Sequence, residues 1–130
     1  MKEEMVPSSE TCKKLWDLGI QVETYFYWVD PFKCDYLPDG VPYLMIRYPH
    51  EKMGPGYRNF PAPTASEIGG LLPRNLHIDG IRYNLQIQKT ESSWFVQYEL
   101  YKAVIHKSLA EALAQMMIWL KENDLLRDKT

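Results

Sequence analysis

The histidines and cysteines of this chain are the side chains best suited to hold a metal or to act as nucleophiles, and they stand far apart. The histidines are His50, His77 and His106, and the cysteines are Cys12 and Cys34. Zinc and redox sites usually pair such ligands at short spacing, as in HExxH or CxxC, and hydrolase serines stand in a GxSxG elbow. None of these patterns occurs. The sequence therefore predicts no catalytic, cofactor-binding or metal-ligating residue.

The acidic and glycine-rich segments also match no recognised site. Asp30, Asp35 and Asp39 lie close to prolines, where aspartates commonly bond the backbone of a turn. Gly54-Pro55-Gly56 and Gly69-Gly70 lack the residue pattern that aims several N–H groups at one phosphate. Because no recognised set of catalytic residues is present in the sequence, we expect a protein that is not an enzyme.

The sequence is rich in aromatic side chains, with nine Tyr, four Trp and four Phe. The candidate interaction surface consists of Tyr25, Tyr27, Trp28, Phe95 and Tyr101. Alternation along a strand over 22–29 would place aromatic rings on both of its faces. If one such face is exposed, it can form a patch for a homodimer or for another protein partner. The alternative is a central strand that helices cover on both sides.

A second candidate surface lies on the solvated face of a strand over 81–89. It carries Arg82, Gln86, Gln88 and Lys89. Basic and aromatic side chains on an exposed sheet can stack and hold a single-stranded nucleic acid. The net charge of −2 and the pI near 5.9 argue against a general nucleic-acid binder, which is usually basic. A third alternative is a small-ligand binder or an enzyme whose site is assembled from distant residues.

The first half of the chain predicts short elements separated by prolines. β-branched and aromatic runs indicate strands, and apolar residues at helical spacing indicate a helix. On that helix Cys12, Leu15 and Trp16 share the inward stripe. The predicted elements are a helix over 9–18, strands over 22–29 and 43–48, and a short edge strand over 57–60.

Two capping boxes mark the starts of two further helices. They are Thr64-Ala65-Ser66-Glu67 and Ser108-Leu109-Ala110-Glu111. The first opens a helix over 65–71, which Pro73 prevents from continuing. The second opens a helix over 109–122, whose wide apolar stripe predicts that it lies largely buried on a sheet.

The clearest β signal is Asp79-Gly80, a two-residue hairpin turn between strands over 75–78 and 81–89. A third strand over 94–101 follows a turn at 90–93. In the long strand, alternate residues predict one buried and one solvated face. The predicted inward residues are Ile81, Tyr83, Leu85 and Ile87, and the outward ones are Arg82, Asn84, Gln86 and Gln88. In 94–101 the predicted inward residues are Trp94, Val96, Tyr98 and Leu100.

Together these elements predict one α+β domain spanning residues 1–130. We expect an antiparallel sheet of four to six strands, with the C-terminal amphipathic helix and one or two short helices packed on one face. We expect residues 1–7 and 124–130 to be flexible. No apolar segment is long enough to cross a membrane, and the N-terminus does not resemble a signal peptide, so a cytoplasmic location with reduced thiols is the default.

One stretch of the chain resembles a known group of proteins. Phe60-Pro61-Ala62-Pro63-Thr64, followed by Glu67-Ile68 and by Leu71-Leu72-Pro73, is similar to a signature of small proteins of phages and mobile elements, many from gut bacteria. The similarity covers about residues 57–122 and includes the C-terminal helix. It implies a phage-associated accessory protein, and its motifs are structural, so the resemblance transfers no catalytic residue.

Overall fold

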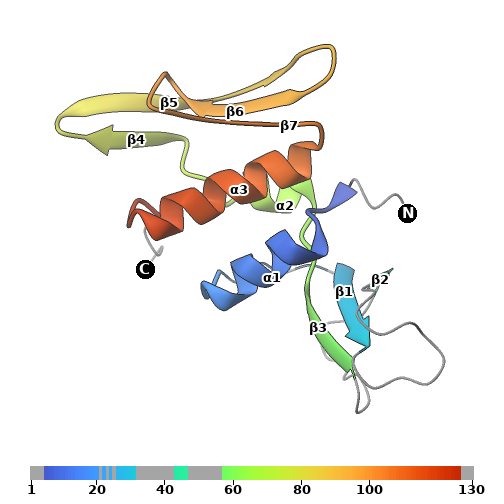
Figure 1. Cartoon of the computed structure of the whole chain (residues 1–130). Coiled ribbons are helices and arrows are strands. Elements are labelled where there is room, and N and C mark those ends of the chain that lie inside the picture. Colours follow the sequence, from blue (N-terminus) through green and yellow to red (C-terminus); the bar gives the residue numbers. More distant parts are fainter. Residues whose placement is uncertain are drawn as a thin grey trace.

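The computed structural model describes residues 5–20, 22, 24, 26–31, 43–46 and 57–126. In these residues the chain forms two antiparallel sheets and three helices (Figure 1). The elements are α1 (Ser9–Asp17), β1 (Phe26–Pro31), β2 (Tyr43–Ile46), β3 (Tyr57–Pro61), α2 (Ala65–Gly69), β4 (Asn75–Ile78), β5 (Ile81–Lys89), β6 (Trp94–Tyr98), β7 (Lys102–His106) and α3 (Leu109–Glu122). This arrangement confirms the predicted α+β class.

The larger sheet has the order β4-β5-β6-β7, so each strand pairs with its neighbour in the sequence. Its first turn is the predicted one: Asp79 and Gly80 have φ values of 52° and 80°, the left-handed conformation that a type I′ turn needs. The predicted strand over 94–101 is wrong at its end, because β6 stops at Tyr98. Leu100 adopts a φ of 67°, and the N–H of Tyr101 bonds the carbonyl of Tyr98 at 2.7 Å. The chain thereby reverses into β7, a strand that the sequence patterns did not predict.

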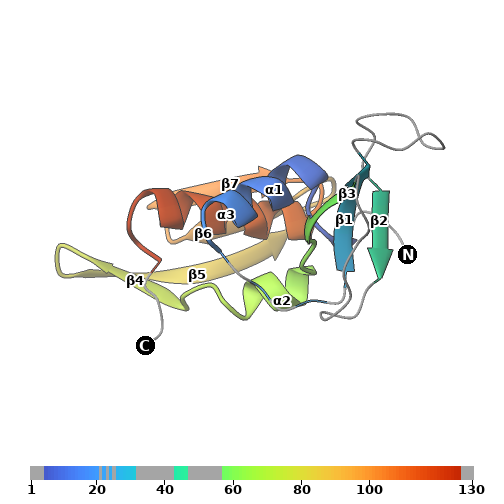
Figure 2. The ribbon, with the colours of Figure 1, turned by 90° about the horizontal axis from the view of Figure 1, so that it is seen from below.

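Helix α3 packs on β6 and β7, and it also contacts both shorter helices. Helix α1 covers the side of α3 that faces away from the sheet, and α2 lies beside α3 (Figures 1 and 2). Because elements cover α3 on several sides, most of its residues are buried. The buried residues of α3 are Ala110, Glu111, Ala112, Leu113, Ala114, Met116, Met117, Ile118 and Leu120.

The alternation predicted for β5 is confirmed in the middle of the strand. Tyr83 and Leu85 pack against the core, whereas Arg82 and Gln86 are exposed. At the ends of β5, Ile81 and Ile87 are 54% and 43% exposed. Figure 1 shows the reason, since the hairpins at both ends of β5 extend past the ends of α3. The opposite face of the sheet carries no helix among the described elements.

The smaller sheet has the order β2-β1-β3 and lies at one end of the molecule (Figure 2). The strand predicted over 22–29 begins only at Phe26, and Val22 and Thr24 are buried outside any strand. The edge strand predicted over 57–60 is confirmed as β3. The strand predicted over 43–48 is confirmed at 43–46, and its last two residues lie outside the described part of the chain.

The start of α2 agrees with the prediction, whereas the end of α2 and the N-terminal segment differ from it. At α2 the box is complete: Thr64 and Glu67 each accept a hydrogen bond from the other's backbone N–H. The helix itself ends at Gly69 and not at 71. Of the N-terminal segment expected to be flexible, Val6 and Pro7 are buried. Of the C-terminal one, 124–126 are described, while 1–4 and 127–130 lie outside the described residues.

Candidate interaction surface

Glu111 is the most site-like carboxylate in the described chain, because it is only 5% exposed. Its oxygens accept hydrogen bonds from the backbone N–H of Ser8 at 2.8 Å, from Thr11 Oγ1 at 2.5 Å and from Gln115 Nε2 at 2.9 Å. Burial acts to raise the pKa of Glu111, but the bonds from Thr11, Ser8 and Gln115 outweigh it, so the pKa lies below its ordinary value. The carboxylate is thus held charged by the start of α1 and has a structural role.

This arrangement also corrects the second predicted capping box. Ser108 does accept from the N–H of Glu111, as predicted. The Glu111 side chain, however, is directed to α1, and the N–H of Ser108 donates to Nδ1 of His106 at 2.9 Å. Glu111 therefore links α3 to the start of α1, about a hundred positions earlier in the sequence.

Cys12 and Trp28 belong to a second, smaller core with Val6 and Ala62. Burial, and then the charge of Glu111, raise the pKa of the Cys12 thiol to about 12, against a smaller opposing effect of Trp28. A thiol this difficult to ionise is a poor nucleophile. Trp28 donates from Nε1 to the carbonyl of Pro7 at 2.9 Å. Both side chains therefore serve packing.

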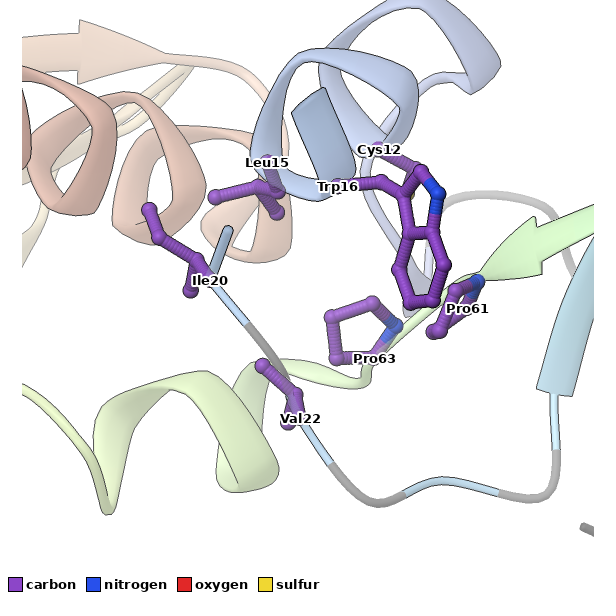
Figure 3. A pocket seen from close by; sticks show the side chains of 7 residues that line it. All are labelled: Cys12, Leu15, Trp16, Ile20, Val22, Pro61 and Pro63. Carbon is purple, nitrogen blue, oxygen red and sulfur yellow. The ribbon is translucent and has the colours of Figure 1, made fainter. Parts of the chain in front are cut away.

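A small apolar cavity borders Cys12. It lies between α1 and the segment around Pro61 and Pro63, with the indole of Trp16 beside it (Figure 3). Its volume of about 10 Å³ is room for a single water at most. Trp16 is 48% exposed, so its predicted place on the buried stripe of α1 is wrong.

A larger cavity is a groove of about 700 Å³ beside β4. Most of its lining is leucine and proline, with Arg74, His77 and Asp124 as its charged or titratable groups. Cys12, Tyr98 and Glu111, which are buried titratable groups in the described part of the chain, are not part of this lining. Nor do three His, Cys, Asp or Glu side chains gather into a metal site anywhere in the described residues.

A group of aromatic and apolar side chains from β5, the β6–β7 turn and α3 is better suited to contact with another protein. The ring of Tyr101 lies 4.8 Å from that of Tyr83 and 5.9 Å from that of Trp119. Leu100 adjoins it in the β6–β7 turn and is 99% exposed. Ile81 shares a face of β5 with Tyr83. We call these five residues, Ile81, Tyr83, Leu100, Tyr101 and Trp119, the end patch.

Elements far apart in the sequence position the end patch. Tyr83 stands in β5, Tyr101 follows the β6–β7 turn, and Trp119 is on the last turns of α3. Lys102 places its ammonium 5.4 Å above the Trp119 ring, an attractive arrangement for a cation and an indole. The rings are therefore fixed before any partner arrives.

The five residues singled out from the sequence do not come together. Tyr101 belongs to the end patch, on the α3 side of the sheet, where its ring lies near that of Trp119. Phe95 is half-buried on the opposite face, next to Ile105 in the register of β6 and β7. Trp28 is buried at 6% exposure and so offers no surface. Tyr27 pairs in β1, without a described side chain, and Tyr25 lies outside the described residues.

The remaining sequence candidates occupy separate places. His77 lies on the groove, and His106 caps the entry to α3. Cys34, Asp35, Asp39, His50 and Gly54-Pro55-Gly56 lie outside the described residues. Within the part of the chain that is described, no helix has the length and apolar character of a membrane span.

Comparison of this chain with family models, curated proteins and solved structures found no match.

Proposed function

We propose that this chain is a non-enzymatic accessory protein that works by binding another protein through the end patch. The phage or mobile-element origin and the cytoplasmic location are parts of the same proposal. The first rests on the resemblance of residues 57–122, and the second on the free, buried thiol of Cys12 together with the composition of the chain.

Leu100 is the observation that carries the proposal. It is 99% exposed and has a φ of 67°, a conformation that costs an L-residue with a side chain roughly 1–2 kcal/mol. Glycine or asparagine would meet this turn at a lower cost. A leucine here destabilises the fold and buries nothing within it, so its contribution is made in contact with a partner.

The rings beside Leu100 support the same function. Tyrosine and tryptophan dominate the energetic centres of protein interfaces, because they bury a large area with little loss of side-chain entropy. Tyr101 is 41% exposed and Ile81 is 54% exposed, so both retain surface to bury. A partner that covers the end patch would bury the protruding side chain of Leu100 together with the exposed parts of Tyr101 and Ile81.

A photo-cross-linking amino acid at position 100 tests the proposal in cells that carry the gene. We expect one dominant cross-linked partner, and we expect Leu100→Asn to abolish its co-purification. The same variant should raise the free energy of unfolding by about 0.5–1 kcal/mol, since it relieves the strained turn. Leu71→Asn, at a leucine 40% exposed elsewhere, is the matched control and should retain the partner. A Leu100→Asn protein that binds as well as the wild type contradicts the proposal.

Binding of nucleic acid is the second candidate, and the bare face of the four-stranded sheet favours it. That face presents Phe95 together with Arg82. Several of its polar groups are bonded to each other, however: Arg82 Nε to Asn84 at 3.1 Å, and Gln97 to Gln86 at 3.0 Å. Titration of labelled single-stranded DNA or RNA at low salt separates the two functions. Absence of a salt-dependent change in anisotropy ends this alternative.

A small-ligand site is the third candidate, and the groove beside β4 is where it would lie. Thermal-shift screening of Arg74→Ala against the wild type tests it. A ligand that stabilises the wild type and not the variant would support this function over the proposed one.

A further inference from the structure

We propose that two copies of this chain pair through the outer edges of β7. The two strands would run antiparallel about a two-fold axis through Val104 and join two four-stranded sheets into one. This pairing is independent of the end patch, because it uses the edge of the sheet and not the β6–β7 turn.

The hydrogen bonds between neighbouring strands of the sheet determine which backbone groups of β7 point away from it. Ser93 and Glu99 flank β6: the N–H of Glu99 bonds the carbonyl of Asn84, and the carbonyl of Ser93 accepts from the N–H of Thr90. Continuing the register of β5 and β6, the odd-numbered residues of β6 therefore direct their backbone groups to β5. The direction of the backbone N–H and C=O groups alternates along a strand. Val96 therefore directs these groups to β7, where its register partner is Val104. The intervening residues of β7, Ala103 and Ile105, consequently direct their N–H and C=O groups away from the sheet.

No described residue supplies a hydrogen bond to these outward groups. An edge of this kind is a template for another strand unless something blocks it. Lysine is the usual protection. Here Lys102 lies on the opposite side of the strand from Ala103 and Ile105, with its ammonium over the Trp119 ring at 5.4 Å. The two outward positions carry no charge.

The edge is complementary to itself in one register. A two-fold axis through Val104 sets Ala103 of each copy opposite Ile105 of the other. Both residues are of the outward type, so all their N–H and C=O groups find partners. The small Ala103 leaves room for the larger Ile105, which is 56% exposed and already lies beside Phe95. The apolar surface formed by Phe95 and Ile105 in one copy thereby continues into the other copy.

On the α3 side of this register, Lys102 of one copy would face His106 of the other, and Val104 would meet Val104 between these two pairs. β-branched pairs of this kind stabilise antiparallel ladders.

The dimer is expected to be weak, because a five-residue edge covers less than a standard protein interface. A dissociation constant between about 1 µM and 1 mM is consistent with that size. Sedimentation velocity of the full chain from about 10 µM to 1 mM is the direct test. We expect the weight-average sedimentation coefficient of the wild type to rise from the monomer value toward the dimer value over this range.

Ala103→Pro should abolish the rise. Proline removes an N–H that the monomer does not use, and edge strands tolerate it where that N–H faces solvent. Asn75→Pro is the matched control at the other edge of the sheet, because Asn75 is outward in β4 by the same alternation. It should dimerise like the wild type. Ile105→Lys is a second variant of the β7 edge, and it serves as the test if circular dichroism shows that Ala103→Pro is unfolded.

Three results would overturn the pairing. The first is a wild type that stays monomeric at 1 mM. The second is a dimer that survives in the folded β7 variants. The third is a dimer lost in Asn75→Pro alone, which would move the contact to β4. Leu100→Asn should leave dimerisation unchanged, so a failure here and a failure of the proposed partner surface are distinguishable.

Discussion

The two cores of this protein differ in how their side chains hold them together. The core around α3 is a continuous apolar cluster whose members include Leu113, Met116 and Tyr98. The small core joins Cys12, Trp28, Val6 and Ala62, and it depends on a few directed bonds, such as that from Trp28 to Pro7. A large apolar core tolerates the loss of a hydrogen bond, whereas a small core loses a large part of its cohesion with each one.

The largest expected effect is at the centre of the α3 core. Leu113→Ala removes a side chain that is 2% exposed and leaves a cavity between α3, α2 and the sheet. We expect a loss of about 2–5 kcal/mol in the free energy of unfolding. Urea denaturation followed by tryptophan fluorescence measures it. A loss below about 1 kcal/mol would mean that the side chain is not enclosed as described.

A smaller effect is expected at Glu111, which links the α3 core to the N-terminal segment. Glu111→Gln replaces charge-assisted bonds by neutral ones and should cost about 1–2 kcal/mol at pH 7. The pKa of Glu111 is lower in the folded chain than its ordinary value, so its stabilisation is present above about pH 5 and is lost as the pH falls through the folded value.

The pH profile separates this effect from simple loss of packing. The difference in unfolding free energy between wild type and Glu111→Gln should shrink below about pH 4 as the wild-type carboxylate becomes protonated. Thermal denaturation between pH 3 and pH 7 tests it. A difference that is constant with pH would contradict a charged role for the carboxylate.

The smallest of these effects concerns the other core. Trp28→Phe removes the indole N–H and leaves the carbonyl of Pro7 with only the weak thiol donor of Cys12 at 3.6 Å, at a cost of about 1 kcal/mol. Because the small core has few members, the loss should fall on local opening of β1 and β3 more than on global unfolding. Proteolysis under native conditions should cleave the variant faster near β1. Equal cleavage of both proteins would argue that the bond is not used.

The sequence predicted the parts of this fold that local chemistry decides. Asp79-Gly80 specifies its turn by its own conformational preferences, and the apolar stripe of 109–122 specifies a buried helix. The end of β6 was missed because Leu100 continues the apolar alternation, although its backbone turns into the left-handed region. No local pattern distinguishes a leucine that continues a strand from one that protrudes from a turn.

The candidate surface was predicted less well, for the same reason on a larger scale. Trp28 looked available because the burial of Val6 and Pro7 against it could not be read from a polar N-terminus. Tyr101 is an exposed aromatic residue, but its neighbours Tyr83 and Trp119 come from β5 and α3. Such a patch exists only after the sheet has closed on the helix, so spacing along the chain cannot reveal it.

Amide hydrogen exchange on the folded chain tests the contrast between the two cores most directly. We predict that the amides of Leu113–Leu120 in α3 exchange only through global unfolding, with the slowest rates in the protein. The amides of β1 should exchange faster, through local opening of the small sheet. Exchange in α3 as fast as in β1, or faster, would contradict the account of α3 as the element on which the fold is built.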